Sequence, residues 1–382
     1  MLRNELLKEI MAVPSPILSV YLNMRSENTA RHPRAGACEV WLEKQVAAIS
    51  RGLSRHDTKE IMKQLQRVKE FLHDRHPKEK ALAIFAGPLS WIAVPLQVGI
   101  ENEVAWGQPS IIQLFWLLHE HHPYGLVVVD HHAARFFAYR LGQLTELATK
   151  EFAVDTSVWK EKKLGHQASS GSQNMRGPYP DRFEHRMEAQ YARLCRETAD
   201  QAVSLSKQYG LIHVFVAGPD RLIDIVQKHF APAATLVRQD LGNFSSAELL
   251  ERLEPIIAEY EQNRQLESVN QLLGSDVADI ANVDETLAQL QSADVRSIVV
   301  SKNLEFDMRH CETCGLASRA ADPVCAVCGG TRTPASFHKL LPALAMSNNT
   351  DIEVVSGEAA QKLNQTGGMS GRPRQTEIAA VR

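Results

Sequence analysis

Four of the six cysteines in this 382-residue chain lie in one short segment, as two copies of the pattern Cys-x-x-Cys-Gly. The glycine after each pair lets the backbone curl, so that both sulfurs of the pair can face one ion. Two such pairs supply four thiolates, which is typical of tetrahedral structural zinc without an open position for catalysis. Four unrelated free thiols are the alternative, and the repeated glycines argue against it. The sequence therefore predicts one Zn²⁺ bound by Cys311, Cys314, Cys325 and Cys328.

The overall composition is that of an ordinary globular protein, with 44% hydrophobic and 23% charged residues. The formal net charge is −3, so any surface that binds nucleic acid must be local. No stretch of about 18 uncharged apolar residues occurs, and the first ten residues lack the apolar core of a signal peptide. We therefore expect a cytoplasmic protein, in which paired cysteines favour a metal over disulfides.

Hydrophobic patterns predict an α/β protein of three domains, with boundaries at residues 1–122, 123–275 and 276–382. In the first domain, a strand over Pro14–Met24 precedes two amphipathic helices between Glu39 and Leu72, with a break near Leu53–Asp57. Two short apolar strands follow on either side of Gly87-Pro88.

The middle domain is predicted to start with a buried strand, Leu126–Asp130, and a partner strand that ends in a turn at Gly142. A loop rich in Ser, Gly, Lys and Asn covers residues 160–181, and a long helix follows over Arg182–Lys207. A strand, a helix and a second strand come next, and Ser245–Leu273 is predicted to form a connecting helix. In the third domain a helix and a strand precede a zinc ribbon at residues 308–333, and another strand and helix follow it.

The loop and the start of the long helix carry a local excess of positive charge. Residues 160–196 contain eight Lys or Arg and four Asp or Glu, a net of +4. Such a segment suits RNA phosphates without sequence specificity, whereas a solvated helix with ion pairs such as Arg193 with Glu197 is the alternative. The residues we expect to contact RNA are Lys160, Lys162, Lys163, Arg176, Arg182 and Arg186.

The order of elements in the third domain resembles the C-terminal domain of archaeal class-1 peptide release factors. The shared order is helix, strand, four-cysteine ribbon, strand, helix and a Gly-Gly segment, here Gly367-Gly368. The ending after these glycines departs from the family, which leaves the last strand open. The chain is thereby similar to bacterial homologues of the archaeo-eukaryotic class-1 release factor and Pelota family.

The middle domain resembles the same family at the loop. Family members carry Gly-Gly-Gln in a basic loop just before a long Arg-rich helix, and Gly171-Ser172-Gln173 occupies that place here. The resemblance implies that this loop enters the peptidyl-transferase centre, where the glutamine helps to place a water against the peptidyl-tRNA ester. The implied loop residues are Gly171, Ser172, Gln173, Asn174 and Arg176.

Two departures from the family pattern bear on activity. Ser172 replaces the middle glycine, and left-handed backbone geometry costs a non-glycine residue about 1–2 kcal/mol. We also find no equivalent of the Asn-Ile-Lys-Ser motif with which family members read stop codons. Gln173 is therefore a vestigial catalytic candidate.

Three function classes follow from these observations. The favoured one is a ribosome-binding factor that occupies the A site in hibernation or rescue without hydrolysis, to which the resemblance adds delivery by elongation factor Tu. The second is a peptide chain release factor that hydrolyses peptidyl-tRNA. The third is a zinc-ribbon module that binds free RNA or another protein.

Five histidines flank the strand Leu126–Asp130 and form the other candidate cluster. His119, His121 and His122 precede the strand, and His131 and His132 follow Asp130. The two groups lie at opposite ends of an extended strand, so one metal site cannot use both. We expect surface histidines at loop ends. No Walker loop, GxGxxG, GxSxG or HExxH motif occurs in the sequence.

Overall fold

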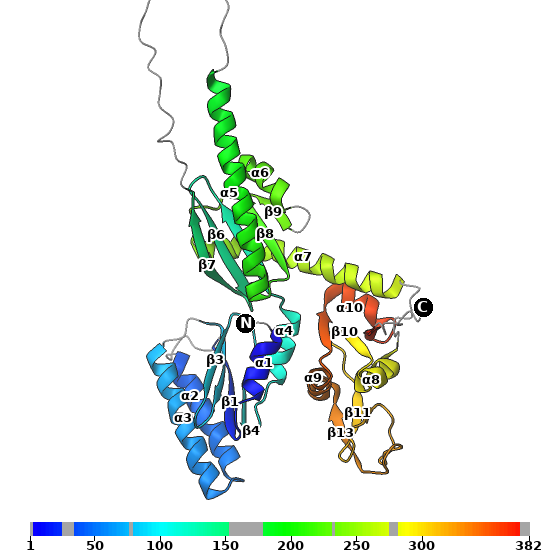
Figure 1. The fold of residues 1–382 in the computed structure, drawn as a ribbon. Helices are drawn as coiled ribbons and strands as arrows, with labels where there is room; N and C mark the ends of the chain where they lie inside the picture. Colours follow the sequence, from blue (N-terminus) through cyan, green and yellow to red (C-terminus); the bar gives the residue numbers. More distant parts are fainter. Residues whose placement is uncertain are drawn as a thin grey trace, which may run out of the picture. The chain divides into compact units, whose positions relative to one another are not determined.

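The computed structural model describes residues 3–24, 34–75, 79–152, 179–230, 234–274 and 282–374. The chain divides into two compact units: Pro123–Glu251, and a second unit composed of Leu2–His122 together with Arg252–Arg382. Figure 1 shows the ribbon, and each unit is described by itself. Among the described residues, no helix has both the length and the apolarity needed to cross a membrane.

The N-terminal part of the second unit is built on an antiparallel sheet of four strands in the order β3-β2-β1-β4. Strand β1 is central, pairing with β2 on one side and β4 on the other. The elements are α1 (Arg3–Met11), β1 (Ile17–Asn23), α2 (Arg34–Ser50), α3 (Arg55–Arg75), β2 (Ala81–Ala86), β3 (Trp91–Leu96), β4 (Glu103–Gly107) and α4 (Ile112–Glu120).

The core of this part lies between the sheet and the pair α2 and α3. Leu18, Val20 and Leu22 alternate along β1, so they share one face of the sheet, and they are fully buried against Leu42 and Ile61 of the two helices. The predicted strand, the helix pair and the two apolar strands are confirmed. Helices α1 and α4 carry too few residues for a decisive helical period, and the sequence did not assign them.

The first unit contains a mixed sheet of five strands in the order β7-β6-β5-β8-β9. Strands β5, β8 and β9 run parallel, which suits the continuous apolar run of β5, whereas β6 and β7 are antiparallel. The predicted turn at Gly142 has φ +76°, and strand β7 after it was not predicted. The bounds are β5 (Tyr124–Val129), β6 (Ala133–Arg140), β7 (Gln143–Glu151), α5 (Tyr179–Tyr209), β8 (His213–Gly218), α6 (Asp220–Phe230) and β9 (Ala234–Arg238).

The long helix α5 packs on this sheet through its C-terminal half. Cys195, Ala199 and Ala202 are buried against Val127 of β5 and Phe136 of β6. Small side chains at intervals of three and four residues let the helix approach the sheet closely. In Figure 1 the N-terminal part of α5 continues beyond the sheet.

The C-terminal part of the second unit contains a sheet of three strands in the order β14-β10-β15, parallel between β10 and β14. Strand β15, which the sequence left open, is formed. Gly368 before it has φ +85°, and a Cβ there would lie 2.7 Å from Leu304 Cδ1, so only glycine fits. The elements are α7 (Ser246–Gly274), α8 (Val283–Gln291), β10 (Val295–Ser301), α9 (Phe337–Ser347), β14 (Asp351–Val355), α10 (Gly357–Asn364) and β15 (Met369–Pro373).

A buried ionic network fixes α7 to this sheet. Arg264 donates hydrogen bonds of 2.8 Å to Glu261 on its own helix and to Glu353 of β14. His122, directly after α4, lies 3.2 Å from the Glu261 carboxylate. Burial alone would raise the pKa of Glu261, but hydrogen bonds from His122 and Arg264 outweigh it and hold the pKa at about 2. The network thus depends on a charged Glu261.

Candidate metal centre

The four paired cysteines lie on a small antiparallel sheet between β10 and α9 in the sequence. Its strands are β11 (Asp307–Cys311), β12 (Ala317–Ser318) and β13 (Arg332–Ser336), in the order β12-β11-β13. Cys311 is the last residue of β11. Cys314 lies in the segment between β11 and β12, and Cys325 and Cys328 lie in the segment between β12 and β13. This arrangement is compatible with the zinc ribbon that the sequence predicts.

The two cysteine pairs form turns of the same geometry, here called the first knuckle (Cys311–Gly315) and the second knuckle (Cys325–Gly329). In the first, the Gly315 N–H donates to the Cys311 carbonyl at 2.9 Å. In the second, the Gly329 N–H donates to the Cys325 carbonyl at the same distance of 2.9 Å. Both glycines have positive φ, +76° and +70°, a conformation that L side chains rarely adopt.

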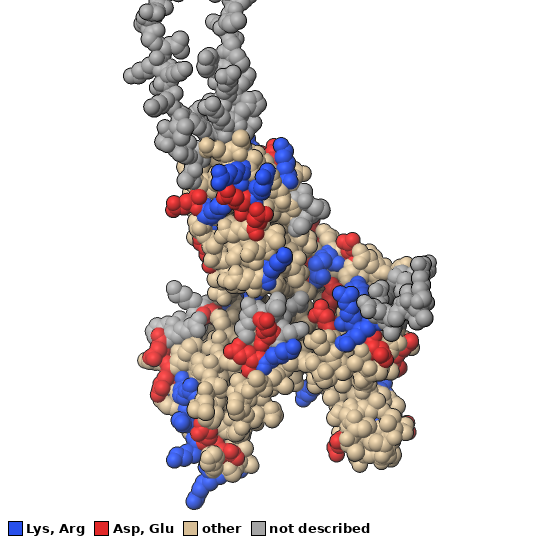
Figure 2. Space-filling model, viewed as in Figure 1, with Lys and Arg blue, Asp and Glu red and all other residues tan. Residues whose placement is uncertain are grey.

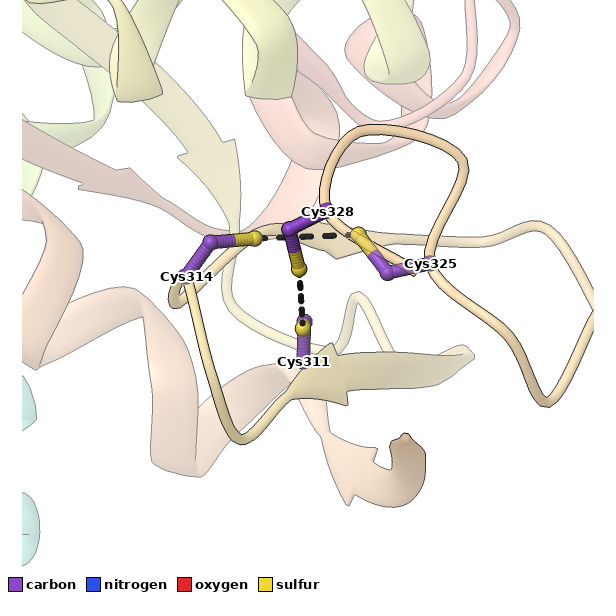
Figure 3. A group of neighbouring side chains, drawn as sticks. All are labelled: Cys311, Cys314, Cys325 and Cys328. Carbon is purple, nitrogen blue, oxygen red and sulfur yellow. Dashed lines mark hydrogen bonds between the residues drawn. The ribbon is translucent and has the colours of Figure 1, made fainter. Parts of the chain in front are cut away.

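The knuckles bring the four sulfurs together around one point, as Figure 3 shows. All four lie within 4.8 Å of one another, with 3.5 Å from Cys311 Sγ to Cys328 Sγ and 3.6 Å from Cys314 Sγ to Cys325 Sγ. Four sulfurs around a tetrahedral ion at about 2.3 Å would be about 3.8 Å apart. The donor set therefore fits a single thiophilic metal ion.

Backbone amides inside the knuckles favour thiolates. The N–H of Cys314 is the largest influence on Cys311 and helps to lower its pKa to about 6. The N–H of Cys328 acts in the same way on Cys325, whose pKa is also lowered. The N–H of Gly330 lowers the pKa of Cys328, but hydrogen bonds shared with neighbouring sulfurs outweigh it and raise that pKa to about 12. A metal ion would displace this shared proton, because bound cysteines are thiolates.

Two further residues hold the knuckles in place, and no sequence pattern singled them out. A Cβ on Gly330 would lie 2.4 Å from Thr313 Oγ1 and 3.2 Å from Cys311 Sγ, so glycine is required where the two knuckles meet. Arg332 is 5% exposed, and it donates to Ser318 Oγ at 2.6 Å and to the Asp322 carbonyl at 3.1 Å. These bonds join β12, β13 and the segment before the second knuckle.

Residues 160–178 of the loop predicted to reach the peptidyl-transferase centre lie outside the described part of the chain. The last three predicted loop residues, 179–181, instead begin helix α5. Arg182 and Arg186 are on the first turns of α5, but the structure does not describe their side chains. The other residues predicted to contact RNA or to form the loop lie outside the described ranges: Lys160, Lys162, Lys163, Gly171, Ser172, Gln173, Asn174 and Arg176.

In the described part of α5, charged side chains form ion pairs with one another and with strand β7. Arg193 pairs with Glu197 one helical turn on at 2.9 Å, which confirms the expected ion pair. Lys150 of β7 donates to the same carboxylate at 2.7 Å, and this bond, followed by that of Arg193, lowers the pKa of Glu197. The positive charges of Arg193 and Lys150 are therefore partly neutralised by Glu197. Figure 2 shows Lys and Arg interspersed with Asp and Glu on the surface of this unit.

The expectation of surface histidines was wrong at two positions. His119 and His122 are 2% and 5% exposed, because both lie in or next to the buried helix α4. His131 and His132 are exposed, and Asp130 accepts the His132 backbone N–H at 2.6 Å in a turn rather than orienting an imidazole. Within the described ranges, the four ribbon cysteines are the group of three or more His, Cys, Asp or Glu that could hold a metal.

One protein-family model matches the middle of the chain. Residues 109–257 match the model of bacterial archaeo-eukaryotic release factor family 10. The matched range covers α4, the whole five-stranded sheet, the loop and α5. No curated protein sequence matches the chain.

Archaeal and yeast proteins are among the solved structures with a detectable likeness. A structure of ribosome-bound archaeal Pelota and ABCE1 is 13% identical, covers 77% of each chain and has a TM-score of 0.41. Saccharomyces cerevisiae Dom34, a translation termination-like factor, is 9% identical over 98% of this chain and 93% of its own, with a TM-score of 0.36. The archaeal translation termination factor aRF1 is 14% identical over 98% of each chain, with a TM-score of 0.24. These TM-scores are too low for the likeness to bear on function.

Proposed function

Because residues 109–257 match the model of a bacterial release-factor family, we propose that this chain is a ribosome-binding translation factor. It occupies the A site of the 70S ribosome and reaches the peptidyl-transferase centre with the loop 160–181. Its role is in hibernation or rescue, without hydrolysis of peptidyl-tRNA. The observation that carries the proposal is the family match, because it spans the loop and the helix that presents it.

Helix α5 supports this role by its length. Its 31 residues correspond to about 46 Å at a rise of about 1.5 Å per residue. The C-terminal half packs on the sheet through Cys195, Ala199 and Ala202. In Figure 1 the N-terminal part of α5 continues beyond the sheet. A projecting element of this kind suits a narrow binding site lined by RNA.

The chemistry of the loop supports docking without catalysis. Hydrolysis would need Gln173 held on a backbone that is free to adopt positive φ. Ser172 occupies the position before it, where a side chain costs about 1–2 kcal/mol in that conformation. Lys160, Lys162, Lys163 and Arg176 supply phosphate affinity without sequence specificity. In this proposal the basic side chains of the loop bind ribosomal RNA phosphates, and the loop sets the position of the protein in the A site.

The metal we propose for the ribbon is Zn²⁺, one ion per chain. Four cysteine sulfurs without imidazole or carboxylate ligands are the donor set of structural zinc, and they leave no coordination position for substrate. The ion would hold the two knuckles together in a mini-domain with few buried side chains. Its proposed role is therefore structural.

The cellular setting follows from the same proposal. A factor that fills the A site without reading a stop codon acts on idle or stalled ribosomes, as expected in the cytoplasm under stress. We propose that it is a counterpart of the hibernation factor Balon, that it contacts ribosomal RNA, and that elongation factor Tu delivers it. A catalytic release factor is the second candidate, favoured only by the retained Gln173.

Cosedimentation with 70S ribosomes, with and without mRNA, tests the proposal. We expect binding that does not depend on mRNA and that weakens as salt rises, because bound phosphates must release counterions. Release of labelled formyl-methionine from stop-codon-programmed ribosomes should stay at background. Binding only to programmed ribosomes, with release abolished by Gln173→Ala, would establish the catalytic alternative. Failure to sediment with any ribosome would remove both candidates.

A further inference from the structure

We propose that Cys314 and Cys328 are the sites at which peroxides attack the ribbon, and that oxidation joins the two knuckles by disulfides. The predicted pairs are Cys314 with Cys325 and Cys328 with Cys311, and the metal leaves as they form. This inference rests on the proposed binding of zinc. It adds to that proposal a site of oxidation, Cys314 and Cys328, and a class of oxidant, the peroxides.

Access to the four cysteines is unequal. Cys311 and Cys325, the first residues of the two knuckles, are 0% and 2% exposed, whereas Cys314 and Cys328 are exposed. Their neighbours are exposed as well, including Val327 at 74%. A small oxidant therefore reaches one sulfur of each knuckle first.

Each exposed sulfur is in contact with a buried sulfur of the other knuckle. Cys314 Sγ lies 3.6 Å from Cys325 Sγ, and Cys328 Sγ lies 3.5 Å from Cys311 Sγ. Figure 3 shows both contacts as crossing between the knuckles. A disulfide needs about 2.05 Å, so each pair must close by about 1.5 Å. Each exposed sulfur thus has a buried partner placed to resolve it.

The reaction balances with hydrogen peroxide as the oxidant. One thiolate of the exposed pair attacks the peroxide, which forms a sulfenic acid and releases hydroxide. The buried thiolate facing it then attacks that sulfur, forms the disulfide and expels a second hydroxide. Two peroxide molecules convert the four thiolates into two disulfides, release Zn²⁺ and leave four hydroxide ions. A thiol reductant reverses the oxidation, after which zinc can rebind.

Pairing between knuckles has a structural consequence. A disulfide within either knuckle would leave the two knuckles unlinked once the metal is lost. Disulfides between knuckles instead replace the metal by a covalent link at the same place, beside the contact of Gly330 with Thr313. The oxidised ribbon therefore stays closed and can return to the metal-bound form.

Tryptic mapping, followed by partial reduction and differential alkylation of any linked species, tests the pairing. Cleavage after Arg309, Arg319 and Arg332 yields one peptide with the first knuckle, residues 310–319, and one with the second, residues 320–332. Full-length protein is treated with hydrogen peroxide, alkylated, digested and analysed by mass spectrometry, while a zinc-sensitive dye follows release of the ion. We expect complete loss of the single zinc and one disulfide-linked species containing both peptides. The Cys38→Ser/Cys195→Ala variant is the matched control and should give the same result.

Two results would overturn the inference. Separate peptides, each lighter by two hydrogens, would show disulfides within knuckles, and unmodified cysteines after zinc loss would exclude oxidation as the cause. Untreated protein without zinc would instead refute the metal assignment. In that case the linked peptides from oxidised, metal-free protein, after the same partial reduction and alkylation, still decide the pairing.

Discussion

The Glu261→Gln substitution tests the ionic network that fixes α7 to β14. Glu261 accepts hydrogen bonds from Arg264 at 2.8 Å and lies 3.2 Å from His122. Its pKa in the folded protein is about 2, against an ordinary value of 4.5. A difference of about 2.5, at about 1.36 kcal/mol for each pKa unit, corresponds to about 3.4 kcal/mol. Substitution by glutamine removes the charge but keeps the shape, so we expect a loss of up to about 3 kcal/mol at neutral pH.

The pH dependence follows from the direction of this shift. Because the pKa of Glu261 is lower in the folded than in the unfolded protein, its contribution to stability is complete above pH 4.5. The contribution is lost as pH falls from 4.5 toward 2, where the folded carboxylate takes up its proton. The wild type should therefore lose more stability than the variant in this range.

Urea unfolding followed by tryptophan fluorescence measures both effects, since Trp116 of α4 donates to the His338 carbonyl within the same unit. Glu259→Gln is the matched control, because Glu259 is an exposed carboxylate on the same helix. The control should match the wild type at every pH. The reasoning fails if Glu261→Gln is no less stable than the control at pH 7, or if its pH dependence parallels that of the wild type.

Four other predictions concern the metal and the loop. Metal analysis should find one zinc per chain, and Cys311→Ser/Cys325→Ser should lose it, because two thiolates cannot complete the tetrahedron. Gly330→Ala should weaken zinc binding measured by chelator competition, since its Cβ would lie 2.4 Å from Thr313 Oγ1, whereas Gly274→Ala has open space and should not. Arg176→Ala/Arg182→Ala should lower ribosome affinity and flatten its salt dependence by about two counterions in sedimentation assays, and unchanged binding would argue against contact by the loop. Ser172→Gly should leave ribosome occupancy unchanged and raise formyl-methionine release above the wild-type background, and no rise would show that glycine freedom is not what limits hydrolysis.

Local patterns in the sequence predicted much of the fold. The apolar run of β5 predicted a buried strand, and the helical spacing between Glu39 and Leu72 predicted the pair α2 and α3. Both depend on side chains within one element, whose period is written directly into the sequence. Strand β7 and helix α4 were not assigned, because β7 is largely exposed and α4 is only nine residues long.

The candidate metal centre was predictable for the same reason. Each knuckle is five residues long, and its glycine and two cysteines fix the local geometry regardless of the rest of the chain. The contacts that hold the two knuckles against each other could not be predicted from the sequence. Gly330 and Arg332 matter because of atoms from other segments, Thr313 and Ser318, and neither residue belongs to a recognisable spacing.

The sequence by itself determined the α/β class, the four clustered cysteines and the release-factor-like middle region, because each depends on residues close together along the chain. Tertiary structure alone decided which histidines are buried and which partners the buried charged residues have. His122 and Arg264 are 142 positions apart, and Arg264 and Glu353 are 89 apart. No periodic pattern connects such distant residues, and their partners are set by how α4, α7 and β14 pack. Whether a histidine is a surface residue or part of a buried ionic network is therefore a property of the folded chain.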